Sequence, residues 1–337
     1  MDRGGADIWE EMLTEFRALG GTAENICLKE GCYGRGLFPV APSKPVKVLI
    51  PDSLLLDYEY VEFRHGVFKI AAEAPIGARE RAFLENYECE FSWPAGRSEI
   101  ESLLHTVQES SPELRELLKK SYYGYRWVAE PTPETVQERF LESRVIHYKD
   151  MDVIMPIVEL ANHGQVGQYE VGDGVGLSGI FAGEILVQYQ LCDPLQIFGK
   201  WGFASDSELL ALSIHLKMEQ AGLVIGRDDP KPKQERKPFL PTVTVEGGKI
   251  NFPYILLGHK RQPGLPRGNF IRTMRDAGRL RSEAEDLFDL LQHANRLHML
   301  QLLAASEEAP PRLARLLQRV SRFQMEAMSH YIGRGEP

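Results

Sequence analysis

Several features that identify common classes of protein are missing or sparse in this sequence. It holds four cysteines in 337 residues and no CxxC pair, which argues against a disulfide framework or a zinc cluster and favours reduced thiols. The most apolar stretches are short and interrupted by proline or charge, so none reaches the roughly 20 apolar residues of a transmembrane helix. The opening MDRGGADIWEEML is acidic and lacks the apolar core of an export signal. We therefore expect a cytoplasmic protein without a membrane partner, with the nucleus as the alternative if the source is eukaryotic.

An excess of positive charge is also missing. The net charge is -9, which argues against nucleic acid as a partner. The charge is uneven, because residues 206–337 hold 20 Lys and Arg against 16 Asp and Glu, a net of +4, whereas residues 1–205 carry -13. The acidic part would attract a cationic partner, although both parts can equally be solvated faces.

Short motifs of several enzyme classes are absent as well. No GxSxG nucleophile elbow and no HExxH metal site occurs. His293 and His298 stand five positions apart in a helical pattern, so they point to different faces and predict no metal site. Gly34-Arg35-Gly36 lies between two expected strands, which is the wrong context for a dinucleotide or phosphate loop.

The patterns that are present indicate an α+β protein. Residues 6–19 have apolar side chains at helical spacing, and residues 25–60 read as short strands with Gly and Pro between them. A helical stretch follows at about 76–145, where Ser111-Pro112 and Thr132-Pro133 each place a capping hydroxyl before a first-turn proline. Further strands are expected at 152–160, 167–171 and 183–190, a charged linker at 228–238, a hairpin around Gly247-Gly248, and helices from 268 to 332. We expect two domains, 1–205 with the helical insert and a mainly helical 206–337.

Taken singly, the candidate site residues have ordinary structural explanations. The Gly34-Arg35-Gly36 segment can be a plain tight turn, because glycine permits positive φ. Asn162-His163 follows an apolar segment and can cap its end. Tyr189 closes another apolar segment, where a core position is the simplest explanation.

The order of these motifs is more specific than any one of them. CYGRGLF (32–38) leads into IPDSLLL (50–56), and then come Ser143-Arg144, PIVELANHG (156–164), GEILVQYQ (183–190) and KWGFASD (200–206). This succession resembles the SET-domain protein methyltransferases, in the branch that includes the Rubisco large-subunit lysine methyltransferase and the animal actin-histidine methyltransferase. The resemblance spans about 25–206. It implies a fold of short strands with a pseudoknot and a helical insert, followed by a helical domain that binds substrate.

The resemblance also implies a cofactor, S-adenosylmethionine, and a set of residues that hold it. The backbone of Tyr33 and Arg35 would hold the methionine moiety, with Gly34 and Gly36 permitting close approach, and Arg144 would pair with the carboxylate. Asn162 and His163 would bind the donor through side chain and backbone. The complete implied set is Tyr33, Gly34, Arg35, Gly36, Arg144, Glu159, Asn162, His163, Trp201 and Phe203, with no metal ligand.

Tyr189 would be the catalytic residue, orienting the amine of a lysine for in-line methyl transfer. The implied partner is a protein with a lysine in a basic segment, and acidic residues of the insert (Glu88, Glu90, Glu99) would attract it. The sequence departs from the family pattern at Glu159 (commonly Asp), Gln190 (commonly Gly) and Trp201 (commonly Tyr). These departures keep a second interpretation open, a catalytically impaired SET-like scaffold that binds donor or protein. A third is an unrelated α+β protein.

Overall fold

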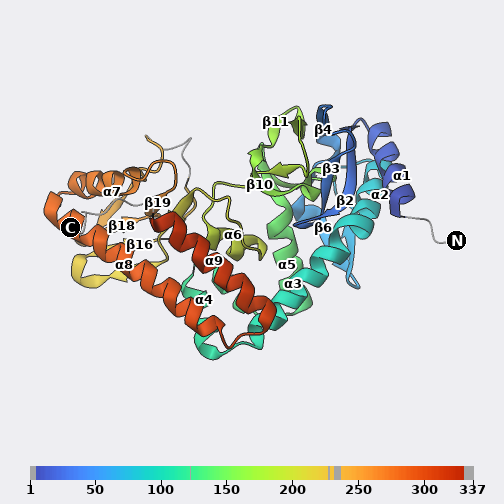
Figure 1. Cartoon of the computed structure of the whole chain (residues 1–337). Helices are drawn as coiled ribbons and strands as arrows, with labels where there is room; N and C mark the ends of the chain where they lie inside the picture. Colours follow the sequence, from blue (N-terminus) through green and yellow to red (C-terminus); the bar gives the residue numbers. More distant parts are fainter. Residues whose placement is uncertain (1–4, 122, 227, 231–236, 330–337) are drawn as a thin grey trace. The chain divides into compact units, whose positions relative to one another are not determined.

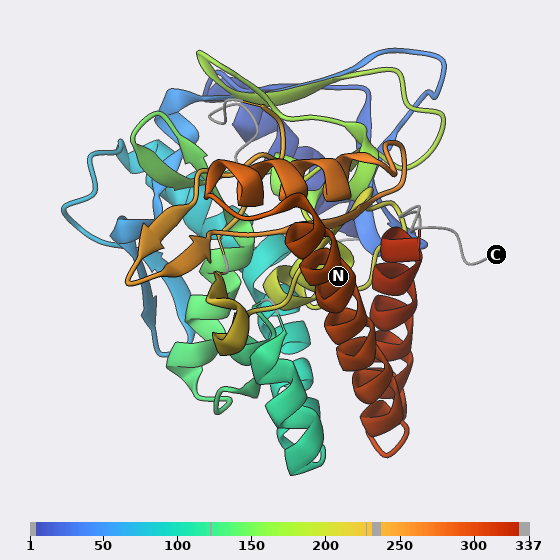
Figure 2. The ribbon, with the colours of Figure 1, turned by 90° about the vertical axis from the view of Figure 1, so that its left-hand side faces the viewer.

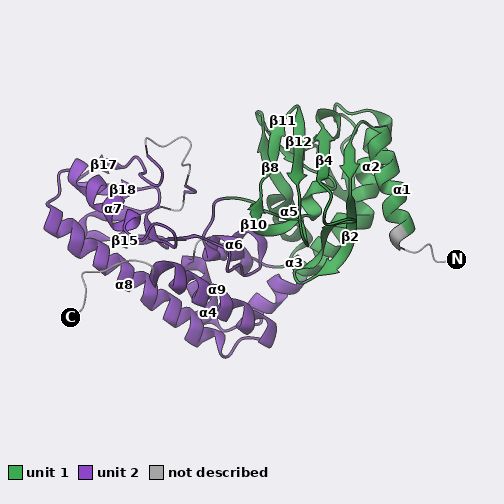
Figure 3. Cartoon of the chain, turned by 45° about the horizontal axis from the view of Figure 1, so that its top comes forward, with its two compact units in different colours: residues 1–101, 131–190 green, residues 102–130, 191–337 purple. Residues whose placement is uncertain are grey.

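The computed structural model describes residues 5–121, 123–226, 228–230 and 237–329 (Figure 1). The described chain forms two compact units, which Figure 3 colours separately. Unit 1 lies within 1–101 and 131–190, and unit 2 within 102–130 and 191–337. These limits differ from the expected domains, because the segments 102–130 and 191–205 pack with the C-terminal residues. The functional division into a catalytic and a substrate-binding domain stays a prediction.

Unit 1 is built from several small sheets. The largest has four antiparallel strands in the order β1-β4-β12-β11: Thr22–Glu24, Val46–Pro51, Gly174–Gly179 and Glu170–Gly172. In β4 the alternating sequence VKVLIP buries Val46, Val48 and Ile50, as a half-buried strand requires. The smaller sheets are β2–β3 (Ile26–Gly31, Gly34–Pro39), β5-β9-β8 (Leu56–Asp57, Met151–Ile154, Val145–Tyr148), β6–β7 (Val61–Arg64, Val67–Ile70) and β10–β13 (Asn162–Gly167, Leu186–Val187).

Three helices of unit 1 begin within about two residues of the predicted starts. Helix α1 (Gly5–Ala18) buries Phe16, which stacks on Phe83 of α2 (Ala78–Tyr87) at 5.9 Å between ring centroids. A π-helical turn, Glu88–Ser92, joins α2 to α3 (Trp93–Gln108), whose residues from 102 onward belong to unit 2. Helix α5 (Pro133–Arg144) begins at Thr132, which accepts a hydrogen bond from Thr135 N and confirms the predicted cap.

Two predicted strands are shorter than expected. The segment 152–160 is extended only through Ile154, after which Pro156 cannot donate to a ladder and Ile157 adopts φ 67°. Val158–Leu160 then forms a 3-10 turn, so Asn162 begins strand β10 instead of closing the one before it. The segment 183–190 is a strand only over β13, which places Tyr189 beyond the strand.

Unit 2 combines short strands with long helices. Its strands are β14 (Leu210–Leu212) paired with β19 (Leu256–His259), and a four-stranded sheet of β15 (Leu216–Met218), β16 (Leu223–Ile225), β18 (Lys249–Phe252) and β17 (Thr244–Glu246). Hairpin β17–β18 turns at the predicted Gly247-Gly248. The helices are α4 (Pro112–Lys120), α6 (Pro194–Trp201), α7 (Leu265–Asp276), α8 (Arg281–Ser306) and α9 (Pro311–Ser329).

Helices α8 and α9 run antiparallel side by side, as both views show (Figures 1 and 2). Their apolar faces join β16, β18 and α7 in one core that includes Ile225, Phe252, Phe288 and Met328. The structure therefore confirms the α+β class, the helical insert and the mainly helical C-terminal region.

No helix in the described part of the chain combines the length and the apolar character that a membrane crossing requires. No group of three or more His, Cys, Asp or Glu in the same residues is arranged to hold a metal ion.

Candidate active site

The glycine-rich segment forms the return strand of the β2–β3 hairpin. Gly31 pairs with Gly34, so Cys32 and Tyr33 form the tip, and the Tyr33 side chain is 58% exposed. Gly34 adopts φ 90°, a conformation that favours glycine. The Arg35 guanidinium donates to the Phe91 carbonyl, which anchors the hairpin to the π-helical turn.

Gly36 is required for a different reason, because its backbone runs against two side chains. A Cβ added there would lie 2.4 Å from Glu184 Oε1 and 2.6 Å from Asn162 Nδ2. A Cβ at Gly34 would meet nothing within 4 Å. The hairpin therefore approaches Asn162 and Glu184 closely at Gly36 and needs only conformational freedom at Gly34.

The predicted Asn162-His163 pair begins β10, next to β13. Asn162 and His163 pair in parallel with Leu186 and Val187, and Ile185 N bonds to Leu37 O of β3 at 2.8 Å. Residues 185–187 therefore lie between β3 and β10. This pairing brings segments far apart in the sequence to one place.

His163 is buried and contacts the predicted catalytic tyrosine directly. Its Nδ1 accepts a hydrogen bond from Tyr189 N at 3.3 Å, so Nδ1 carries no proton in this arrangement. The two rings meet edge to face with centroids 5.1 Å apart. His163 thus fixes the position of the Tyr189 backbone.

Tyr189 is half-buried, and its hydroxyl donates to Ala161 O at 3.0 Å. Burial raises its pKa to about 12, while the Arg144 charge opposes the rise and Glu159 and Glu184 add to it. The phenol therefore stays protonated at neutral pH. Tyr189 can orient a neighbouring group by hydrogen bonding but is no general base there.

Arg144 and Glu159, both predicted site residues, lie next to each other. Arg144 Nε is 3.8 Å from Glu159 Oε2, and Tyr87 donates to Glu159 Oε1 at 2.9 Å. Both Arg144 Nε and Glu159 Oε2 are buried and make no hydrogen bond to any described residue. A buried guanidinium N–H without an acceptor fits the carboxylate of an amino-acid group, so the residues present fit the methionine moiety of S-adenosylmethionine.

Four neighbours were not assigned from the sequence: Tyr87, Glu88, Tyr169 and Glu184. Glu88 is 1% exposed, and its pKa is raised well above the usual range by burial and then by the Glu159 charge. The expectation that Glu88 attracts substrate from solution is therefore wrong, because this side chain, in the π-helical turn that follows α2, is buried. Glu184 stands in the quoted GEILVQYQ motif, whereas nothing in the local sequence links Tyr87 or Glu88 to Glu159.

Trp201 and Phe203 belong to unit 2. Trp201 ends α6, and Gly202 follows in a left-handed conformation with φ 77°. The Lys200 ammonium lies 5.6 Å from the Trp201 ring centroid and 2.8 Å from Asp229 Oδ2. The predicted contact of Trp201 and Phe203 with the donor stays a prediction.

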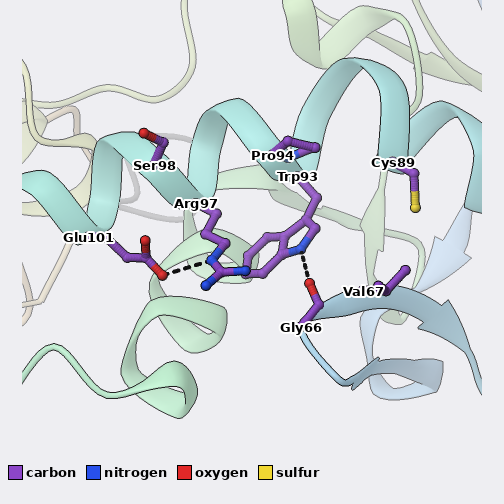
Figure 4. A pocket seen from close by; sticks show the side chains of 8 residues that line it. All are labelled: Gly66, Val67, Cys89, Trp93, Pro94, Arg97, Ser98 and Glu101. Carbon is purple, nitrogen blue, oxygen red and sulfur yellow. Dashed lines mark hydrogen bonds and ion pairs between the residues drawn. The ribbon is translucent and has the colours of Figure 1, made fainter.

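A cavity of about 420 Å³ in unit 1 is lined by none of the predicted site residues (Figure 4). It lies between the β6–β7 turn and the start of α3. Its lining is Gly66, Val67, Cys89, Trp93, Pro94, Arg97, Ser98 and Glu101. Trp93 Nε1 donates to Gly66 O, and Arg97 pairs with Glu101 at 2.7 Å, so these polar groups are already paired.

The comparisons with known proteins find a likeness among solved structures and none among sequences. No family model matches the chain. No curated protein matches it. Among solved structures, the chain is similar to one described as the SET domain of LSMT bound to lysine and AdoHcy, at 13% sequence identity and a TM-score of 0.47, over 97% of this chain and 90% of that one. We base the functional assignment on the residues of the site itself.

Proposed function

We propose that this chain is an S-adenosylmethionine-dependent protein N-methyltransferase of the SET type, in the branch resembling the Rubisco large-subunit lysine methyltransferase, with a lysine amine as acceptor. One observation carries the proposal. Strands β10 and β13 bring together Gly36 of the hairpin, the Asn162-His163 pair and Tyr189. The charge of Arg144 acts on the Tyr189 phenol.

The residues of unit 1 would hold the donor by its amino-acid end. Arg144 Nε lies 3.8 Å from Glu159 Oε2 and makes no hydrogen bond to the described residues, and the guanidinium charge suits the donor carboxylate. Asn162, half-buried beside the backbone of Arg35, offers an amide to the same end of the molecule. When bound, S-adenosylmethionine supplies a methyl group on a positively charged sulfur.

Tyr189 would position the acceptor amine. A lysine amine has a pKa of about 10.4 in water and must lose its proton before it can attack. A half-buried site next to a positive sulfur favours the neutral amine by desolvation and like-charge repulsion. The Tyr189 hydroxyl, held by Ala161 O, presents oxygen lone pairs that orient the amine, and the gain in rate comes from positioning.

The test separates transfer from donor binding. In Tyr189→Phe we expect methyl transfer from labelled donor to proteins of the host lysate to fall at least 100-fold, with binding of S-adenosylhomocysteine within about threefold of wild type. Tyr58→Phe, which changes an exposed tyrosine of the same unit, should leave both unchanged. Mass spectrometry of the labelled protein should place the methyl group on a lysine. Undiminished transfer by Tyr189→Phe would refute the catalytic role.

A catalytically impaired scaffold is the second candidate. The departures at Gln190 and Trp201 favour it, because Gln190 directly follows Tyr189 and Trp201 belongs to the set expected to contact the donor. In that case the wild-type chain would bind S-adenosylhomocysteine but transfer no methyl group to any protein of the lysate.

A further inference from the structure

The side chain of Glu184 connects three segments of the proposed donor site. Glu184 directly precedes Ile185, which bonds to β3. Its Oε1 accepts a hydrogen bond from Asn162 Nδ2 at 2.5 Å. It pairs with no Lys, Arg or His among the described residues, so its role is not that of a surface ion pair.

The hairpin is shaped around this carboxylate. A Cβ at Gly31 would lie 2.7 Å from Glu184 Oε2, and one at Gly36 would lie 2.4 Å from Oε1. Neither glycine has a positive φ, so backbone conformation does not explain them. Both glycines instead leave room for the carboxylate, and Gly31 also leaves room for the Phe38 ring, whose Cζ would lie 2.7 Å from the added Cβ.

The contacts of Asn162 define the orientation of its amide. Nδ2 donates to Glu184 Oε1 and, at 3.3 Å, to Arg35 O. A carboxylate and a carbonyl both only accept, so this end of the amide must be nitrogen, and both of its hydrogens are used. No group in the described part of the chain donates to Oδ1, which leaves that oxygen as an acceptor on a half-buried side chain.

We propose that Glu184 is a positioning residue that fixes the Asn162 amide so that Oδ1 faces a hydrogen-bond donor on the bound cofactor. This inference rests on the proposed function. An acceptor such as Oδ1 selects a hydrogen-bond donor, and the amino group of the methionine moiety is such a donor.

The experiment measures binding of S-adenosylhomocysteine by calorimetry, with the donor KM and kcat as a second readout. In Glu184→Ala we expect about tenfold weaker binding and a raised donor KM, with kcat at saturating donor within about threefold. Glu184→Gln keeps an acceptor at the same reach and should bind within about threefold of wild type. Glu184→Asp keeps the charge but withdraws it by one methylene, and should bind as weakly as Glu184→Ala. Glu24→Ala, at an exposed position in β1, is the matched control.

A double-mutant cycle distinguishes positioning from general support of the fold. In the Asn162→Ala background, Glu184→Ala should change the affinity by less than twofold, because its target is gone. Independent, additive losses would overturn the proposal, and so would wild-type affinity in Glu184→Ala. If Glu184→Ala does not fold, Glu184→Gln and Glu184→Asp provide the test instead. Equal affinity of these two variants for S-adenosylhomocysteine would overturn the proposal. A wild-type chain that binds no donor would refute the proposed function itself.

Discussion

At the scale of single residues, the site gathers several titratable side chains that are wholly or partly buried. Glu159 and Arg144 are adjacent, and the charge of Glu159 also acts on Glu88. Buried carboxylates without full hydrogen bonding are costly, and they persist where a site needs them. The π-helical turn at Glu88–Ser92 belongs to the same region, and such turns occur frequently at functional sites.

Glu88 makes stability depend on pH in a defined direction. Burial and then the Glu159 charge raise its pKa, so the native state keeps a proton that the unfolded state has already released. This contribution to stability is full at low pH and is lost as pH rises. Glu88→Gln should therefore raise the melting temperature at pH 8 by more than it does at pH 5, since each unit of pKa difference is worth about 1.4 kcal/mol.

Thermal unfolding at both pH values measures the effect. Glu90→Gln changes an exposed neighbour and should leave the wild-type difference between pH 5 and pH 8 intact. A gain that is the same at both pH values would contradict the assignment of the proton to Glu88.

Residue positions were predictable from the sequence only where a motif marks them. Asn162, His163 and Tyr189 stand in motifs whose order indicates a family, and the structure brings them together. Tyr87 and Glu88 lie on a helix with no such signal, and only tertiary packing carries them to Glu159.

At the scale of elements, the β2–β3 hairpin is the part of the site most sensitive to added volume. Gly36→Ala would force its Cβ against Glu184 and Asn162, and we expect a loss of about 1–3 kcal/mol in stability together with weaker donor binding. Gly172→Ala is the matched control, because a Cβ there meets nothing within 4 Å. Its stability should change by no more than about 0.5 kcal/mol.

Denaturant unfolding and calorimetry with S-adenosylhomocysteine provide the two readouts. Equal stability and affinity in the two alanine variants would show that the hairpin has room to move, against the close approach described at Gly36.

Elements were predictable where local chemistry determines them. Thr132-Pro133 and Ser111-Pro112 place both helix starts correctly, because a capping hydroxyl and a first-turn proline act within one turn. The strand expected at 152–160 is too long in the prediction, because the apolar residues continue past Pro156 and Ile157, where the extended backbone ends. The parallel pairing of β10 with β13 depends on contacts distant in sequence, which no local pattern reveals.

At the scale of the whole molecule, the charge distribution suggests which substrates are captured. Residues 1–205 carry a net charge of -13, so we propose that a basic segment surrounds the target lysine. With Glu88 buried, the exposed Glu90 and Glu99 remain to attract it. The variant Glu90→Gln/Glu99→Gln should raise the KM for a basic protein substrate about two- to fivefold at low salt and by much less at 0.5 M salt.

Methyl-transfer kinetics at the two salt concentrations check this expectation. Glu219→Gln, in unit 2, serves as the control for loss of negative charge elsewhere in the chain. A KM that does not change at low salt would show that Glu90 and Glu99 do not contribute to substrate capture.

The most direct test of the central claim is equilibrium binding of S-adenosylhomocysteine to the wild-type chain and to Arg144→Lys. We predict saturable binding of one molecule per chain to the wild type. The lysine variant should bind at least tenfold more weakly, because a single ammonium cannot replace the two-pronged guanidinium. Absence of binding to the wild type, or equal binding to both proteins, would contradict the assignment of this site to a methyl donor.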